Sequence, residues 1–253
     1  MTDDRSGSGL TDFGYQRVAP GEKGARVRAV FDSVANRYDV MNDLMSMGAH
    51  RLWKRFMLDI ASIQRGQHVL DVAAGTGDIS MGLARAVGSS GLVVMSDINE
   101  AMLARGRDRM INAGMTTGIV PVLADAERLP FAARSFDCVT IAFGLRNVTD
   151  KARALDAMRE VLKPGGQLLV LEFSRPKVPV LGPIYDAYSF QVLPRLGRLV
   201  AGDADSYRYL AESIRMHPDQ EALLQLMQQA GLEDCRYHNL AGGIVALHRG
   251  WRY

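Results

Sequence analysis

The chain has 253 residues, a formal net charge of +2 and 47% hydrophobic residues, a composition typical of a soluble globular protein. This small net charge gives no electrostatic reason to expect a nucleic-acid partner. Cys138 and Cys235 are too few for a disulfide framework or a zinc site, so we expect a reducing cytoplasm and no metal. No apolar run approaches the ~20 residues that span a bilayer. Residues 1–24 lack an apolar signal core and are expected to form a flexible tail, and residues 25–253 a single domain.

Residues 25–60 are expected to form a helical lid at the start of this domain. Apolar residues recur at helical spacing in both halves of the segment. The linker between the halves combines methionines with Tyr38, Asp39 and His50. Because methionines make an adaptable apolar surface, the linker either packs the helices onto a sheet or covers an apolar substrate.

The turn Gly75-Thr76-Gly77 is the centre of the pattern. It follows an apolar run, 69–73, typical of a buried parallel strand, and precedes a helical pattern at 79–87. Glycines let the backbone approach a ligand closely. Strand, glycine turn and helix are the nucleotide-binding start of a doubly wound sheet.

The residues beside this turn separate two classes of ligand. A dinucleotide fingerprint has Gly or Ala three residues after the second Gly, where this chain has Ser80. Asp78 at the helix N-terminus is unfavourable for a pyrophosphate. Asp78 and Asp71 suit the ammonium and sulfonium of S-adenosylmethionine (SAM). The pattern therefore favours SAM bound at the glycine turn over NAD or a purely structural turn.

The next two expected strands, 91–97 and 119–125, each end in an acidic residue. Asp97 follows the second glycine of the turn by 20 positions (97 − 77), the offset at which an acid binds ribose hydroxyls. Its alternative role is to cap the following helix. Asp125 and Ala126 are expected beside an adenine, with the carboxylate accepting from the amino group. Capping is again the alternative for Asp125.

The fourth expected strand, 136–143, leads into a loop that contains Arg146 and Asn147. Ligands of open α/β sheets bind at the carboxyl ends of the strands, which makes this loop a candidate site. In the alternative interpretation, Arg146 pairs with a neighbouring acid and Asn147 makes a turn.

After a fifth strand at 167–173, residues 174–212 form an insertion rich in proline and aromatic residues. The insertion could close the pocket, bind an apolar tail, touch a membrane surface or simply cover the sheet. A helix up to residue 230 and a hairpin at 236–248 are expected to complete the fold.

The chain resembles the ubiquinone/menaquinone biosynthesis C-methyltransferases (UbiE-type) within the class I SAM-dependent methyltransferases. The resemblance runs from about Val27 to the C-terminus. Its motifs lie at 38–43, 50–54, 143–150, 171–174 and 207–214. Where the family has a more glycine-rich loop, this chain has Ala73-Ala74, a change that we expect to be tolerated.

This resemblance implies an α/β fold with a seven-stranded, mostly parallel sheet, helices on both faces and an antiparallel C-terminal hairpin. It implies methylation of a ring carbon of a polyprenylated quinol, a methoxybenzoquinol or demethylmenaquinol, with SAM as cofactor. The tail of such a substrate implies transient contact with a membrane surface, hence a cytoplasmic protein peripheral at the inner membrane face. A homodimer or a quinone-biosynthesis complex stays open, and a class I methyltransferase for another phenol or lipid is the alternative.

The expected chemistry assigns roles to the candidate residues. A quinol attacks through carbon only after losing a phenolic proton, and a free phenol has a pKa of ~10. Arg146 stays protonated, so it is a poor base but could hold the phenolate by charge, while Asn147 orients the same oxygen. The candidate bases are Asp39, His50 or a water held by Tyr38.

Overall fold

The computed structural model of this chain describes most of the sequence. The described residues are 9–34, 42–43, 46–115, 117–179, 182, 185, 187–192, 194–195, 198 and 203–253.

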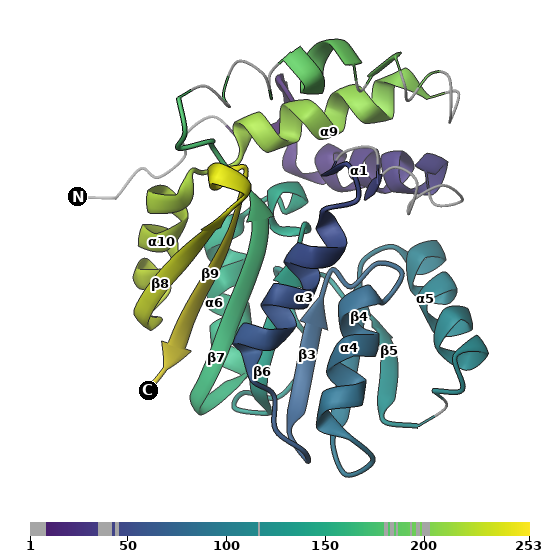
Figure 1. Cartoon of the computed structure of the whole chain (residues 1–253), viewed down its shortest axis with the longest axis vertical. Helices are drawn as coiled ribbons and strands as arrows, with labels where there is room; N and C mark the ends of the chain where they lie inside the picture. Colours follow the sequence, from purple (N-terminus) through teal and green to yellow (C-terminus); the bar gives the residue numbers. More distant parts are fainter. Residues whose placement is uncertain are drawn as a thin grey trace.

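The centre of the fold is a seven-stranded sheet with the order β5-β4-β3-β6-β7-β9-β8 (Figure 1). Its strands are β3 (His68–Val72), β4 (Leu92–Asp97), β5 (Ile119–Leu123), β6 (Phe136–Ala142), β7 (Leu162–Phe173), β8 (Glu233–Leu240) and β9 (Val245–Arg252). The first five pair in parallel, whereas β9 pairs antiparallel with β7 and β8. The strand order reverses between β3 and β6, and the carboxyl ends at such a reversal are where α/β sheets bind ligands. The predicted α/β sheet with its C-terminal hairpin is confirmed.

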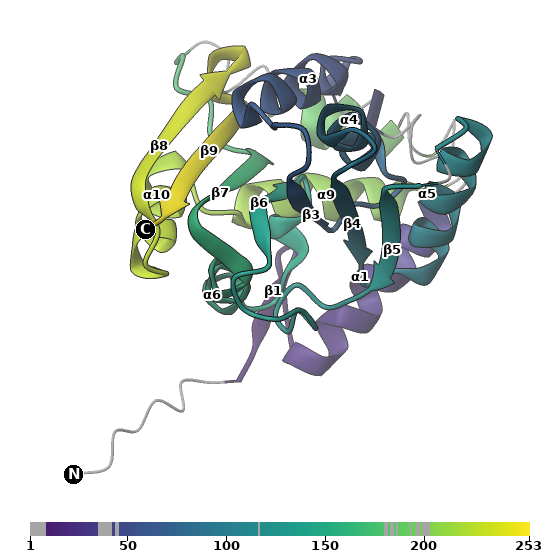
Figure 2. The same cartoon turned by 90° about the horizontal axis from the view of Figure 1, so that it is seen from below.

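Successive strand residues face opposite sides of the sheet, and each side has its own core. Val69 packs in a cluster with α3 (His50–Ala61) and α4 (Asp78–Val87). Its neighbour Leu70 packs on the other side with α6 (Lys151–Val161) and α10 (Gln220–Gln229). Figure 2 shows these two pairs of helices on opposite faces of the sheet. Because the parallel strands are covered on both faces, their sequences are almost continuously apolar.

A third layer crosses the carboxyl edge of the parallel strands. It consists of α1 (Pro20–Val34) and α9 (Ala204–Met216), seen above the sheet in Figure 1. A short hairpin, β1 (Thr11–Phe13) and β2 (Gln16–Val18), packs onto α9, where the rings of Phe13 and Tyr209 stack with centroids 4.2 Å apart.

Two predicted boundaries need correction. The flexible tail up to Gly24 is wrong for residues 9–24, because this polar segment forms the hairpin and the first turn of α1. In the described part of the predicted lid at 25–60, α1 covers the carboxyl edge, whereas α3 packs on a sheet face with Trp53 and Met57 in the core. The insertion at 174–212 includes the short helix η3 (Tyr188–Val192) and most of α9. No helix in the described part of the chain is long and apolar enough to span a membrane.

Candidate active site

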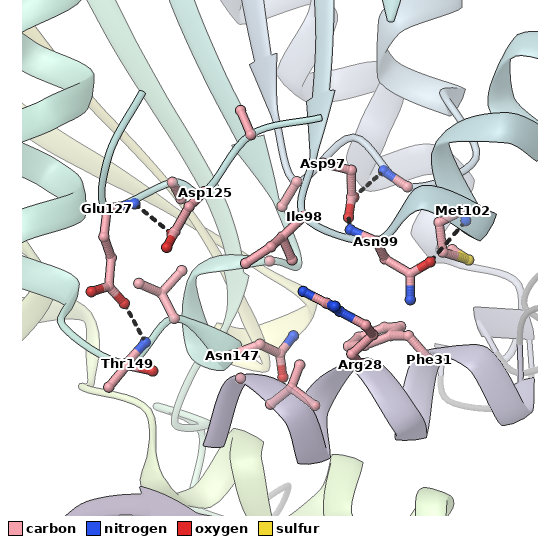
Figure 3. Close-up of a pocket in the computed structure, with 18 of the residues that line it drawn as sticks. Arg28, Phe31, Asp97, Ile98, Asn99, Met102, Asp125, Glu127, Asn147 and Thr149 are labelled. Atoms are coloured by element: carbon pink, nitrogen blue, oxygen red, sulfur yellow. Dashed lines mark hydrogen bonds between the residues drawn. The ribbon is translucent and has the colours of Figure 1, made fainter. Parts of the chain in front are cut away.

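A cavity of about 350 Å³ lies between α1 and the carboxyl ends of the parallel strands (Figure 3). This volume is within the range of small-molecule pockets, about 300–1,000 Å³. One face of α1, with Gly21, Gly24, Val27, Arg28 and Phe31, forms its cover. These positions recur at helical spacing, so a single stripe of the helix faces the cavity.

The glycine turn forms the opposite wall through Gly75, whose backbone N–H donates to Asp97 Oδ2 at 2.8 Å. Gly77 caps α4 with a φ of 81°, a left-handed conformation that favours glycine. Thr76 accepts from Arg109 Nη1 with both its carbonyl and its hydroxyl oxygen. Of the three predicted turn residues, only Gly75 lines this cavity.

The two acids that suggested a cationic ligand have protein partners instead. Asp71 is buried below the turn and accepts hydrogen bonds from the hydroxyls of Ser80 and Thr140. Its burial, only partly offset by these bonds, raises the pKa of Asp71 to about 6. Asp78 pairs with Lys54 at 2.8 Å and with Arg109 at 2.7 Å.

Neither acid lines the cavity. Asp78 is already neutralised, so its charge does not select a cationic cofactor, and that part of the sequence argument is corrected. Asp71, Thr76 and Asp78 do line a smaller cavity of about 20 Å³, which shares Ala73 and Phe143 with the large one. The predicted contact of Asp71 with the cofactor therefore stays a prediction. Both acids hold the strand, the turn and α4 together.

Asp97, at the end of β4, combines a structural and a ligand-binding arrangement. Its two oxygens accept from the backbone N–H groups of Gly75 and Asn99, both at 2.8 Å. A carboxylate oxygen accepts more than one hydrogen bond, so both retain capacity for hydroxyls in the cavity. Burial raises the pKa of Asp97, against the backbone bonds that lower it. The cap of α5 (Glu100–Asn112) is Asn99, whose Oδ1 accepts from the Met102 N–H.

The loop after β5 forms the next part of the rim. Asp125 and Ala126 line the cavity together with Ile98, as predicted for an adenine subsite. Asp125 Oδ1 accepts from the Glu127 N–H at 2.9 Å, which leaves its other oxygen for a ligand. Glu127 Oε1 accepts from the N–H groups of Thr149 and Asp150, and Figure 3 shows the first of these bonds closing the rim between two loops.

The loop after β6 contains the short helix η2 (Leu145–Asn147) and separates its two predicted site residues. Arg146 Nη1 lies 2.7 Å from Glu172 Oε1 and 2.6 Å from the Phe143 carbonyl oxygen. The side chains of Arg146 and Glu172 are only 4% and 2% exposed. Arg146 is not among the residues that line the cavity, so the alternative interpretation, pairing with a neighbouring acid, describes this structure.

Asn147, in contrast, lines the cavity. Its Oδ1 accepts from the Tyr209 hydroxyl at 3.1 Å. Figure 3 shows its amide nitrogen turned toward the cavity, where it can donate to a ligand oxygen. The predicted turn role and the predicted site role of Asn147 are therefore compatible.

Of the three residues predicted to supply or hold the base, the structure describes His50. Tyr38 and Asp39 are outside the described residues. His50 is buried at the start of α3, and its Nε2 lies 2.9 Å from Asp43 Oδ1. Burial lowers the pKa of His50, against the opposing effect of Asp43. His50 is not a lining residue of the cavity.

Several functional positions were missed from sequence. Glu127 and Arg28 line the cavity but carry no local motif that would identify them. Tyr209 lies in the motif at 207–214, but its hydrogen bond to Asn147 was not predicted. The sequence signal that could have identified α1 as the cover of the cavity was its helical stripe of small and apolar residues. Its glycines weakened that signal, because glycine is unfavourable inside a helix. A Cβ added at Gly24 would meet no atom within 4 Å, which is consistent with its position over the cavity.

The cavity fits an adenosyl cofactor without phosphate. Asp97 offers acceptors for ribose hydroxyls, Asp125 one for an adenine amino group, and Gly75 leaves room beside the turn. Val27, Phe31 and Met102 supply an apolar cover.

Comparisons with known proteins agree with this site. A model of the ubiE/COQ5 methyltransferase family matches residues 20–252. The chain is 60% identical over 243 residues to the "Ubiquinone/menaquinone biosynthesis C-methyltransferase UbiE" of Escherichia coli O1:K1 / APEC, covering 96% of this chain and 97% of the relative.

Solved structures show the same fold at low identity. A SAM-dependent methyltransferase from Aquifex aeolicus has a TM-score of 0.58 at 17% identity, with 79% of this chain and 89% of that chain covered. Phosphoethanolamine N-methyltransferase 2 of Haemonchus contortus, in complex with S-adenosyl-L-methionine, has a TM-score of 0.57 at 14% identity, with 75% and 49% covered. The family match along nearly the whole chain, on this fold, shows that the protein belongs to the ubiE/COQ5 methyltransferase family.

Proposed function

We infer that this protein uses SAM to methylate a ring carbon of a quinol in ubiquinone or menaquinone biosynthesis, or in both. The observation that carries this inference is the 60% identity, over 96% of the chain, to a C-methyltransferase of these pathways. The cavity supports it, because the residues around it suit an adenosyl group at one end and an aromatic ring with oxygens at the other.

SAM supplies an activated methyl group, so the chain's own residues have to bind, align and exclude water. Asp97 accepts from the ribose hydroxyls and Asp125 from the adenine amino group. The apolar stripe of α1 closes the site from above, and its fixed position reduces the access of water to the reacting groups. Asn99 Nδ2 donates to Asp32 Oδ1 at 2.8 Å and so attaches α1 to the end of β4.

We propose that Asn147 donates from Nδ2 to an oxygen of the quinol ring. A hydrogen bond to the charged form of a phenol favours that form, so this contact would help the ring lose its proton. Arg146 would act as a positioning residue, because it holds the Phe143 carbonyl and Glu172 beside the Asn147 loop. Tyr38, Asp39 and His50 stay the predicted candidates for the base. The lowered pKa of His50 keeps its ring neutral at pH 7, as a base requires.

The test is methyl transfer from labelled SAM to a short-tailed demethylmenaquinol and to a short-tailed methoxybenzoquinol, each assayed reduced and oxidised. We expect label on carbon with the reduced acceptors only, because an oxidised ring is electron-poor. The ratio between the two acceptors identifies the preferred pathway. SAM binding without transfer to either acceptor would move the assignment to another phenolic or lipid substrate.

The same assay separates the roles of the loop residues. Asn147→Leu should bind SAM normally and lose most methyl transfer. If Arg146→Lys keeps transfer, the fork of donors of Arg146 is not required and its positive charge suffices. Unchanged transfer in Asn147→Leu would contradict the proposed contact.

We further propose a polyprenylated quinol as substrate and transient contact with a membrane surface at the cytoplasmic face. An isoprenoid tail is too long for a pocket of ordinary size. Val178 and Val192, in the segment after β7, are 44% and 39% exposed, and Leu52 on α3 is 71% exposed. Flotation with liposomes of anionic bacterial phospholipids tests this contact. Binding should weaken in a Val178→Asp/Val192→Asp variant and persist in Val120→Asp, an exposed valine on β5. No flotation of the wild-type protein would argue against it.

A further inference from the structure

A second cavity, of about 70 Å³, lies on the other side of the loop that carries Asn147. The β1–β2 hairpin, the first turn of α1, the start of α6 and α9 enclose it. Thr149 lines both this cavity and the cofactor cavity, so the loop is the partition between them.

The walls of this small cavity carry an excess of positive charge. Lys23 and Lys151 both line it, and their ammonium groups donate to the same Val148 carbonyl oxygen, at 3.1 and 3.3 Å. Lys23 is only 2% exposed. In the part of the chain described, neither lysine has a carboxylate within 4.0 Å. A shared carbonyl oxygen leaves most of their N–H donors available.

A third cation lines the same cavity. Arg146 uses Nη1 for Glu172, but its buried Nε has no hydrogen-bond partner among the described residues. This Nε is shielded from the cavity, so Arg146 contributes the positive charge of its guanidinium to the wall.

The acids nearby do not supply this acceptor. Asp12 lines the cavity but pairs with Arg17 at 3.3 Å and has a side chain 38% exposed. Glu127, on the cofactor side of the loop, accepts from the N–H groups of Thr149 and Asp150.

We propose that this cavity is a binding site for a small oxyanion such as inorganic phosphate or sulfate. A water needs about 10–15 Å³ of such volume, so about 70 Å³ has room for the five heavy atoms of either ion. The ion would accept from Lys23 and Lys151 at once, next to the positive charge of Arg146. Because the two lysines belong to α1 and α6 and meet at Val148, a bound anion would join the cover of the cofactor cavity to the Asn147 loop.

The protonation of Lys23 supports this proposal. Burial, followed by repulsion from Lys151, lowers the pKa of Lys23 to about 8, against the smaller opposing effects of Asp12 and Glu127. An anion that favours the charged lysine would bind more weakly as the pH rises from 7 to 9.

The experiment is calorimetric titration of the full-length protein with sodium phosphate at pH 7, repeated with sulfate and with chloride at matched ionic strength. We expect saturable binding of the oxyanions with one ion per chain, and none with chloride. A non-saturating response equal for all three salts, which is general screening, would overturn the proposal.

Variants locate the site. Lys23→Met and Lys151→Met keep the apolar stem of the side chain and should each weaken phosphate binding tenfold or more. Arg153→Met is the matched control, because it removes one positive charge from an exposed position of α6 near Lys151. If both lysine variants, shown to be folded by their circular dichroism, bind phosphate as tightly as Arg153→Met, the cavity is not the site. Since SAM is absent from these titrations, failure here is independent of the proposed methyl transfer.

Discussion

The charged residues at the two ends of the sheet's carboxyl edge are arranged in opposite ways: at one end they face the cavity, and at the other they pair behind its wall. At the β4–β5 end, Asp97 and Asp125 face the cavity and accept from backbone N–H groups of the described residues, so their carboxylates keep capacity for a ligand. At the β6–β7 end, Arg146 and Glu172 neutralise each other below the surface, and the neutral amide of Asn147 faces the cavity.

This difference indicates which group of the ligands each end of the edge can bind. A ribose and an adenine amino group offer donors, and a carboxylate is the best acceptor for them. A quinol ring is neutral until it loses its proton, and an amide can donate to its oxygen without a permanent charge in the cavity. Asp71, at the end of β3 between the two regions, differs from both: it is buried and accepts from two hydroxyl groups, and no cation among the described residues bonds to it.

The largest expected effect comes from breaking the pair at the β6–β7 end. Glu172→Gln leaves the buried Arg146 without its anion, and removing one partner of a buried pair typically costs about 3–5 kcal/mol. Urea unfolding measures this loss in the free energy of unfolding. The double variant Arg146→Met/Glu172→Gln is the control and should recover much of it, because it removes the unpaired cation and keeps an acceptor for the N–H groups of Arg146 and Phe173. A cost below about 1 kcal/mol for Glu172→Gln would mean that the pair behaves like a surface pair.

The next effect is the pH dependence caused by Asp71. Its folded pKa of about 6 lies above the unfolded value, so the carboxyl stabilises the fold fully below about pH 4, and this contribution is lost as the pH rises through 6. Relative to Asp71→Asn, the wild-type protein should lose about 2.4 kcal/mol between pH 4 and 7, since each pKa unit corresponds to about 1.4 kcal/mol and the loss has already begun at pH 4.

Unfolding free energies of both proteins across this range provide the measurement. Asp137→Asn is the matched control, because Lys163 and the His68 N–H, against the effect of burial, lower the pKa of Asp137. That variant should differ from the wild-type protein in the opposite direction. Parallel pH curves for wild type and Asp71→Asn would contradict the assignment.

At the β4–β5 end, Asp97→Asn should weaken SAM binding. Hydrogen bonds to a charged group contribute about 1.5–3 kcal/mol, which is roughly a 10- to 100-fold change in the dissociation constant. Isothermal titration calorimetry with SAM measures it. Asp125→Asn should show a smaller loss, because an amide oxygen can still accept from the adenine amino group. Equal affinity of wild type and Asp97→Asn would remove Asp97 from the cofactor site.

The smallest expected effect concerns the turn between the two ends. Ala73 has a φ of 51°, in the left-handed region that disfavours a Cβ. Ala73→Gly should remove about 1–2 kcal/mol of this conformational cost. Glycine also makes the unfolded chain more flexible, which costs about 0.5–1 kcal/mol on folding. The net result should be a stabilisation of about 0.5 kcal/mol. The measurement is the thermal unfolding of both Ala73→Gly and Ala74→Gly. Ala74→Gly is the control, since Ala74 is outside the left-handed region. Destabilisation of Ala73→Gly to the same extent as Ala74→Gly would show that the strain is negligible.

Much of the fold was predictable because its signals are local. The apolar runs that became β3, β4 and β6 and the glycine turn are each contained in a few consecutive residues. Asp97, Asp125, Ala126 and Gly75 were predictable as lining residues for the same reason, since the end of a parallel strand lies at the ligand edge whatever surrounds it.

The partners of the charged residues were not predictable in this way. Asp78 is neutralised by Lys54, 24 positions earlier, and Arg146 by Glu172, 26 positions later. The sequence shows a charge but not whether another charge lies beside it, and burial makes such pairing necessary. The polar segment at 9–24 was misassigned for a related reason: its hairpin is held by distant contacts, such as the stacking of Phe13 on Tyr209.

The sequence by itself determined the class of fold, the strands along the chain, the family and the acids at the strand ends, because periodicity and short motifs encode these features locally. Only the tertiary structure decided that α1 covers the cavity, that Arg146 lies behind its wall while Asn147 faces it, and that Lys23 meets Lys151 at Val148. These features depend on which segments distant in sequence are packed together, and on the need of every buried charge for a partner.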